Sequence, residues 1–245
     1  MAEILDTAQG RRLAYHRTEG RGPGIIFCGG FMSDMTGTKA VWLEDWARQQ
    51  GRAFLRFDYS GHGESSGAFE EGCIGDWAED AMAALTALTE GPQVLVGSSM
   101  GGWIALLLAR RAPERVKGLV GIAAAPDFTE DSMWPDLSAA QQREVQEQGQ
   151  TAMISAYDDR RFVLTRRLFE DGRAQLVLRD PLPLPFPVRL VQGTEDEAVA
   201  TDVPLRLLAH ADCPDMRLTL VKGADHRFST PECLELIAQM VGEVS

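Results

Sequence analysis

The sequence predicts an α/β protein with a doubly wound, mostly parallel sheet. Short apolar runs rich in β-branched residues alternate with longer amphipathic stretches, which is the pattern of successive βαβ units. Each apolar run is bounded by Gly, Pro or Asp, as strands that end in turns commonly are. The alternation stops once, over residues 127–187. We therefore expect residues 1–245 to form a single domain with a helical lid inserted at about 127–187.

Six apolar runs are expected to form the parallel strands, and residues 1–18 are expected to add one or two antiparallel strands at an edge. The six runs cover residues 24–28, 53–58, 93–96, 116–124, 188–192 and 216–221. Helices are expected over residues 38–50, 73–89, 99–111, 204–211 and 231–241. Within the second of these, apolar residues recur at helical spacing with acids on the opposite face, which is typical of a helix packed on a sheet.

The interruption contains features of its own. A polar helix is expected over residues 139–150 and a second helical stretch near 160–170, followed by a proline-rich extended connector over 181–187. A connection this long at one edge of an α/β sheet usually has a function. This is why we interpret the segment as a lid over a functional site.

Composition narrows the classes of function. The 245 residues are 44% hydrophobic and carry a net charge of −12, so the chain can bury a sizeable core and repels nucleic acid and anionic lipid. No run approaches the roughly 18 apolar residues of a membrane helix. The N-terminus shows no targeting pattern, so we expect a cytoplasmic protein whose partner is a small or protein-borne substrate.

The four cysteines lack the Cys-x-x-Cys spacing, which favours free thiols in a reducing compartment over a disulfide framework. They are Cys28, Cys73, Cys213 and Cys233.

The strongest chemical signal is the segment Gly97-Ser98-Ser99-Met100-Gly101, which lies between a predicted strand and an apolar helix. A Gly-x-Ser-x-Gly at such a turn is typical of a nucleophile elbow, which exposes the serine hydroxyl. A side chain at Gly97 or Gly101 would collide with neighbouring backbone. Ser98 lacks the central position between the two glycines, so Ser99 is the predicted nucleophile.

A serine needs a base to take its proton, and the chain has four histidines. His16 precedes the sheet and His210 lies in a predicted polar helix, so both have structural interpretations. His62 lies in a loop that we expect to cross the floor of the site, but it comes before the serine. His226 follows the predicted strand 216–221, in the chain order serine, acid, histidine that this fold uses. We therefore predict His226 as the base.

The acid that orients the base is expected in the loop after the strand 188–192. Asp196 lies there, three residues after a glycine, and is the first choice. Glu195 and Glu197 are expected to be solvated loop charges. Asp127 follows the preceding strand and stays open as the alternative acid.

Acyl transfer also needs two N–H donors that stabilise the oxyanion. One is expected to be the backbone amide of Met100, the residue after the nucleophile, and the other that of Phe31, in the loop after the strand 24–28. The preceding Gly29 and Gly30 allow the backbone to approach a substrate closely. A simple turn is the alternative interpretation of this loop.

Apolar side chains near the expected mouth of the site predict an apolar acyl group. They are Phe31, Met32, Met100, Met133, Trp134 and Met153, and the alternative is that some of them only pack the lid.

With these residues in place, the chain resembles the α/β-hydrolase superfamily over nearly its whole length, and more narrowly the group of the mitochondrial palmitoyl-protein thioesterase and acyl-glucuronide esterase. The matching stretches are Gly24-Ile-Ile-Phe, Gly37-Thr-Lys-Ala40, Arg56-Phe-Asp-Tyr-Ser-Gly61, Val96-Gly-Ser-Ser-Met-Gly-Gly-Trp103 and Asp225-His-Arg227. The resemblance, which is to a bacterial or processed member, implies the triad Ser99, Asp196 and His226 in a capped site. It also implies cleavage of acyl esters and thioesters without a cofactor or metal.

We therefore expect a serine hydrolase that forms an acyl-Ser99 intermediate. Two alternatives stay open, because both can keep the same triad. One is a peptidase or a hydrolase of carbon–carbon bonds. The other is a non-catalytic receptor for a small molecule.

Overall fold

The computed structural model describes residues 2–154 and 161–245. Its main sheet has eight strands in the order β1-β2-β4-β3-β5-β6-β9-β10. β2 pairs antiparallel with β1 and β4, and the other neighbours are parallel. The strands are β1 (Glu3–Asp6), β2 (Arg12–Thr18), β3 (Arg21–Cys28), β4 (Arg52–Phe57), β5 (Gln93–Ser98), β6 (Val116–Ile122), β9 (Val188–Gly193) and β10 (Met216–Val221). All six predicted parallel strands and the antiparallel edge are confirmed.

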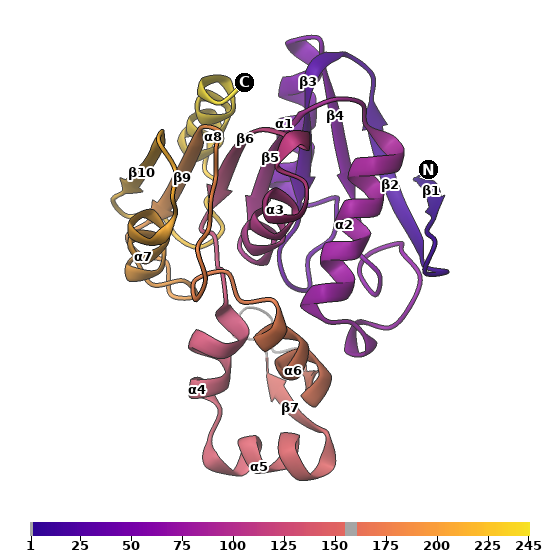
Figure 1. Ribbon diagram of the computed structural model, residues 1–245, viewed down its shortest axis with the longest axis vertical. Coiled ribbons are helices and arrows are strands. Elements are labelled where there is room, and N and C mark those ends of the chain that lie inside the picture. The colour runs from indigo at the N-terminus through magenta and orange to yellow at the C-terminus, as the bar shows by residue number, and fades with distance from the viewer. Residues whose placement is uncertain (1, 155–160) are drawn as a thin grey trace.

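Helices cover both faces of this sheet, as predicted (Figure 1). α1 (Thr38–Gln49) and α8 (Pro231–Glu243) pack on one face, and α2 (Ile74–Leu88), α3 (Met100–Arg111) and α7 (Asp202–His210) on the other. Short 3-10 turns occur at η1 (Phe69–Glu71) and η2 (Pro113–Arg115). The doubly wound arrangement explains why β5 is buried along its whole length: a central strand covered on both faces reads as a continuous apolar run.

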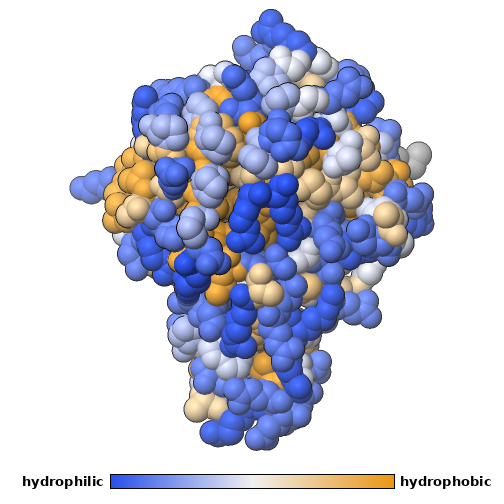
Figure 2. Space-filling view, in the orientation of Figure 1, coloured by the Kyte–Doolittle hydropathy of each residue, from blue (hydrophilic) through white to orange (hydrophobic). Residues whose placement is uncertain are grey.

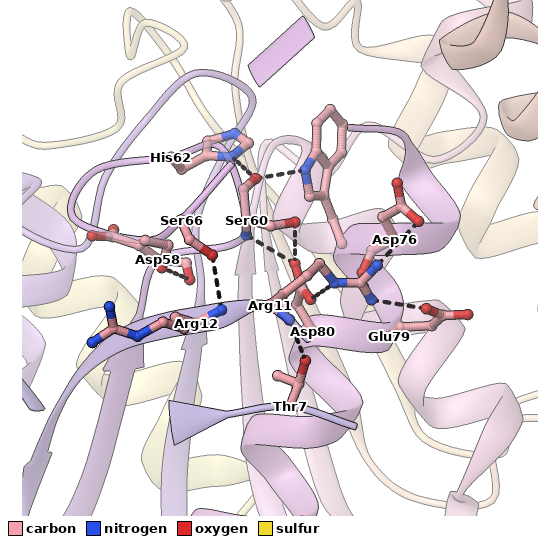
Figure 3. A network of polar contacts seen from close by, with 12 residues as sticks. Thr7, Arg11, Arg12, Asp58, Ser60, His62, Ser66, Asp76, Glu79 and Asp80 are labelled. Atoms are coloured by element: carbon pink, nitrogen blue, oxygen red, sulfur yellow. Dashed lines mark hydrogen bonds and ion pairs between the residues drawn. The ribbon is translucent and has the colours of Figure 1, made fainter. Parts of the chain in front are cut away.

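A buried carboxylate fixes the loop that follows β4 to helix α2 (Figure 3). Asp80 is fully buried, and it accepts hydrogen bonds from the backbone N–H of Ser60 at 2.8 Å and from its hydroxyl at 2.6 Å. Arg11 donates to the same carboxylate at 2.6 Å and forms further ion pairs with Asp76 and Glu79. The network joins the start of β2, the loop and α2 into one unit.

The segment that we call the insertion, residues 127–187, leaves the sheet after β6 and returns at β9. It contains η3 (Thr129–Met133), α4 (Trp134–Asp136), α5 (Ala139–Gln148), β7 (Gln150–Ile154), β8 (Arg161–Thr165) and α6 (Arg166–Ala174). The return from 181 to 187 has no helix and makes only an isolated bridge at Pro183, which confirms the extended connector. Figure 1 shows the insertion extending beyond the carboxyl ends of the central strands.

The predicted helix over 160–170 is wrong in its first half. Residues 161–165 form β8, which pairs antiparallel with β7, and residue 160 lies outside the described residues. The aromatic and β-branched residues in Arg-Phe-Val-Leu-Thr suit a strand once a partner is present. The helix α6 begins only after Thr165, whose hydroxyl accepts from the Leu168 amide at 3.2 Å.

The insertion is docked on helices α2 and α3. Asp171 accepts from the Gly75 amide at 2.6 Å, and Arg167 pairs with Asp76 at 2.7 Å. The Trp103 indole donates to the Gln175 carbonyl at 3.1 Å. Its outer surface is mostly hydrophilic in the view of Figure 2, with small separate apolar patches, as expected of a segment whose apolar side chains face the sheet domain.

No helix in residues 2–154 and 161–245 is long and apolar enough to cross a membrane. All four cysteines are free thiols, as predicted, and Cys213 alone among them is partly exposed. The expected compartment stays a prediction.

The Arg11 network predicts that replacing Arg11 lowers the free energy of unfolding much more than replacing its neighbour Arg12. Replacing Arg11 with Met leaves the buried Asp80 carboxylate without its cation, so we expect the free energy of unfolding to fall by about 3 kcal/mol. Arg12 is the matched control, because its side chain is 65% exposed and its pair with Asp6 lies in solvent. Denaturant unfolding followed by circular dichroism measures both. Equal losses in Arg11→Met and Arg12→Met would contradict the role given to the network.

Candidate active site

Ser99 occupies a strained turn between β5 and α3. Its backbone has φ 55° and ψ −120°, a left-handed conformation that is costly for a residue with a side chain. Three hydrogen bonds hold it there. The Ser99 amide donates to the Ile122 carbonyl at 2.9 Å, and its carbonyl accepts from the amides of Gly102 at 2.9 Å and Ala125 at 3.1 Å. The surrounding strands therefore impose the conformation that lifts the side chain off the sheet.

The two glycines that flank this turn have no room for a side chain, as predicted. A Cβ at Gly97 would lie 2.3 Å from the Gly101 carbonyl oxygen, and one at Gly101 would lie 2.0 Å from the Cys28 carbonyl oxygen. Both distances are far below van der Waals contact. The first turn of α3 can reach β3 and β5 this closely only with glycine at these positions.

The structure brings the three predicted triad side chains together. His226 Nε2 lies 3.2 Å from Ser99 Oγ, and His226 Nδ1 lies 2.9 and 3.0 Å from the two carboxylate oxygens of Asp196. Asp196 and His226 come from the loops after β9 and β10, at the same edge of the sheet as Ser99. The histidine can therefore contact a serine hydroxyl with one nitrogen and a carboxylate with the other.

Asp196 is held by more than the histidine. Its side chain is fully buried and accepts from the backbone amides of Ala198 at 2.9 Å and Val199 at 2.8 Å, and from the Gln192 side chain at 2.8 Å. Burial acts to raise the pKa of Asp196, but the hydrogen bonds from His226 and the backbone amides outweigh it and leave the pKa below its usual 3.8. The carboxylate is thus ionised at neutral pH and fixed in orientation.

The alternative acid, Asp127, has different partners. Its buried carboxylate accepts from the amides of Val177 at 2.8 Å and Leu178 at 3.0 Å, and it pairs with Arg179 at 3.3 Å. These contacts join the start of the insertion to the residues that follow α6. Asp196 is the carboxylate that contacts His226.

The other three histidines lie elsewhere. His62 is buried among the rings of Tyr59, Phe69 and Trp77, where burial lowers its pKa, so it is neutral at neutral pH. His16 lies on β2. His210 ends α7, and its Nε2 contacts the Asp180 carbonyl at 2.8 Å.

The two predicted oxyanion donors adjoin Ser99. Met100 is the first residue of α3, and Phe31 follows Gly30, whose Cβ, if present, would lie 3.5 Å from Ser99 Cβ. Within residues 2–154 and 161–245, neither the Phe31 nor the Met100 backbone N–H has a hydrogen-bond acceptor. Both amides are available to an incoming oxygen atom.

A cleft of about 420 Å³ opens beside Ser99 and His226. Its lining also includes Phe27 and Phe31 as apolar walls, together with Lys39 and Arg227. Lys39 was missed by the sequence analysis, although it lies within the stretch Gly37-Thr-Lys-Ala40. Its distance in sequence from every catalytic candidate gave no signal that it faces them.

Most of the apolar residues predicted at the mouth do not line this cleft. Met133, Trp134 and Met153 pack against the hydrophobic core instead, and the Trp134 ring contacts Phe169 of α6 at a centroid distance of 5.0 Å. Of the predicted set, Phe31 lines the cleft. In the described part of the chain, no three His, Cys, Asp or Glu side chains are arranged to hold a metal ion.

Comparison with known proteins shows the family to which the chain belongs. The family model for the alpha/beta hydrolase fold matches residues 23–181. The chain belongs to the α/β hydrolase family. This hydrolase is 37% identical over 226 residues to the mitochondrial palmitoyl-protein thioesterase ABHD10 of Rattus norvegicus. The aligned region covers 92% of this chain and 76% of the relative.

Two solved structures are similar to this α/β hydrolase over its whole length. A structure from Agrobacterium vitis S4 has a TM-score of 0.94 at 38% identity and covers 100% of this chain and 98% of its own. Alpha/beta hydrolase domain-containing protein 10 from mouse has a TM-score of 0.91 at 35% identity, with 100% of both chains covered.

The hydrogen bonds to Asp196 predict a pH-dependent contribution to stability. We expect Asp196→Asn to lower the free energy of unfolding by about 2 kcal/mol at neutral pH. Because the pKa is lower in the folded protein than the usual 3.8, this contribution is complete well above 3.8 and is lost as the pH falls through the folded value. The gap between wild type and variant should therefore narrow in acid.

Thermal denaturation in buffers from neutral pH to about pH 3 measures this gap. Glu197→Gln, a change in the exposed neighbour, is the control and should follow the wild type throughout. A gap that widens towards low pH would refute the stabilised carboxylate.

Proposed function

We propose that this α/β hydrolase is a serine esterase or thioesterase that cleaves acyl groups from small or protein-borne substrates through an acyl-Ser99 intermediate. The observation that carries the proposal is the continuous chain of contacts from Asp196 through His226 to Ser99 Oγ at the wall of a cleft. Such a chain is the arrangement that activates a serine hydroxyl.

In the acylation step, Ser99 Oγ attacks the carbonyl carbon of the ester or thioester while His226 Nε2 takes the hydroxyl proton. Asp196 stabilises the resulting imidazolium and keeps Nδ1 as the donor to its carboxylate. Collapse of the tetrahedral intermediate breaks the bond to the leaving alcohol or thiol, which receives the proton from Nε2. The products of this step are acyl-Ser99 and the free alcohol or thiol.

Deacylation repeats the sequence with water. His226 takes a proton from the water molecule as its oxygen attacks the acyl carbon, and then returns the proton to Ser99 Oγ as the acid leaves. In both steps the negative charge develops on the former carbonyl oxygen. The amides of Phe31 and Met100 are the donors proposed to stabilise it.

The substrate is proposed to carry an apolar acyl group, and the insertion to act as the lid. The support is the position of Phe31, which lines the cleft and contacts two rings of the insertion, Phe128 at 5.7 Å and Phe162 at 6.3 Å between centroids. The relation to a palmitoyl-protein thioesterase supports an acyl thioester on a protein as one substrate class. Among the described residues, the insertion is linked to this cleft through its contacts with Phe31 and does not line it directly.

Replacing Ser99 with Ala removes the proposed nucleophile. We expect the kcat for p-nitrophenyl esters to fall by about 10⁴-fold or more. Labelling by a fluorophosphonate probe should be lost as well. Ser98→Ala is the matched control, because Ser98 precedes the turn and should keep both activities. Full labelling of Ser99→Ala would refute the assignment, and wild-type activity on peptides or diketones alone would favour the peptidase or carbon–carbon hydrolase.

The apolar wall predicts a preference for longer acyl chains. From acetyl to hexanoyl p-nitrophenyl esters, kcat/KM should rise by up to about fourfold for each buried methylene. Phe31→Ala should flatten this dependence, whereas Phe31→Leu should retain most of it, since both variants keep the backbone N–H. No preference beyond acetyl in the wild type would contradict an apolar acyl site.

A further inference from the structure

The cleft contains one of the three lysines of the chain, and the mechanism proposed above does not use this side chain. The chain uses arginine for nearly all of its 24 basic residues, and the lysines are Lys39, Lys117 and Lys222. Lys117 and Lys222 are exposed, whereas Lys39 is partly buried in the wall of the cleft that holds Ser99 and His226. An ammonium in this place is unusual because burial penalises its charge.

Lys39 reaches the loop that carries the histidine. It lies in the first turn of α1, and its Nζ donates a hydrogen bond to the backbone carbonyl of Arg227, the residue after His226. This contact spans 188 residues of sequence. It is made to the backbone, so it depends on where the loop lies and not on the Arg227 side chain.

The same loop is held on its other side by the loop of the acid. The Glu195 amide donates to the Ala224 carbonyl at 3.0 Å, and the Gly223 amide donates to the Thr194 hydroxyl at 2.9 Å. These bonds fix the residues before His226 relative to Asp196. Lys39 fixes the residue after it relative to α1, so the imidazole lies between two anchored points.

Lys39 also places a positive charge beside the histidine and its carboxylate. The charged or ionisable groups around it are Asp225 and Arg227 on the histidine loop, Asp196 on the acid loop, Asp34 before α1, His226 and the Cys233 thiol of α8. Burial lowers the pKa of Lys39 to about 8, with Asp225 acting in the opposite direction. The side chain is therefore mostly protonated at neutral pH. Its charge favours an ionised Asp196.

We propose that Lys39 is a positioning residue for the Ser99 reaction: it anchors the loop of His226 through the Arg227 carbonyl and so holds the imidazole within reach of the serine hydroxyl. This role rests on the function proposed above.

The test compares Lys39→Met, which removes the charge and the donor at similar length, with Lys39→Arg, which keeps both. We expect Lys39→Met to lower kcat for a p-nitrophenyl ester by about tenfold with little change in KM, because a displaced imidazole slows the chemical step. Lys39→Arg should restore most of the rate, and Lys117→Met should match the wild type.

A second readout does not need turnover. The ring signals of the four histidines can be followed by NMR in histidine-labelled protein, with His226 assigned from His226→Gln. In Lys39→Met the ring signals of His226 should move from their wild-type positions, because the loop that carries the ring loses its anchor, while those of the other three histidines stay. If the wild type hydrolyses no ester or thioester, the proposed function fails while this comparison still tests Lys39.

Two results would overturn the proposal. One is an unchanged rate and unchanged His226 ring signals in Lys39→Met. The other is a lower rate with the His226 ring signals unmoved, because a residue that only packs the wall of the cleft would behave in that way. If Lys39→Met does not fold, Lys39→Leu provides the same loss of the donor for the comparison.

Discussion

The close approach of three backbone segments around Ser99 is the constraint on which the site depends. The end of β5, the end of β3 and the first turn of α3 meet with no space for a Cβ at Gly97 or Gly101. The hydrogen bonds to Ile122 and Ala125 hold the backbone of Ser99 in its left-handed conformation. The hydroxyl and the Met100 amide therefore project from a rigid element, which is where precise catalytic geometry is best kept.

The remaining parts of the site are attached to this rigid point by longer contacts. The loops after β9 and β10 bring Asp196 and His226 to the serine because parallel strands place their carboxyl ends at one edge of the sheet. Lys39 adds a tie from the opposite face, since α1 packs there with α8. The groups of the candidate site therefore depend on the helices of both faces, although the contacts that link Asp196, His226 and Ser99 lie at one edge of the sheet.

Sequence patterns were sufficient for the parts of the fold that are set locally. The strands could be predicted because β-branched runs end in turns, and Ser99, Asp196 and His226 could be predicted because each follows such a run in a fixed order. The strand β8 could not, because its partner β7 lies across residues that do not signal a hairpin, and a short apolar run is ambiguous between helix and strand. Lys39 could not either, since its contact with Arg227 arises only when α1 and α8 are packed together. The insertion was also predicted to supply Met133, Trp134 and Met153 to the site, but their apolar surface is used to bury the insertion itself.

The clamp made by Asp127 has a consequence for how this molecule can diverge. Its carboxylate accepts hydrogen bonds from the amides of Val177 and Leu178, so one side chain joins the point at which the insertion leaves the sheet to the residues that follow α6. These hydrogen bonds therefore offset part of the entropic cost of closing the intervening loop. That cost grows only slowly with loop length. The segment between Asp127 and Val177 can therefore be lengthened, shortened or exchanged while the strands and the turn at Ser99 keep their places. Related proteins can then differ in the segment that covers the sheet while the candidate site stays the same.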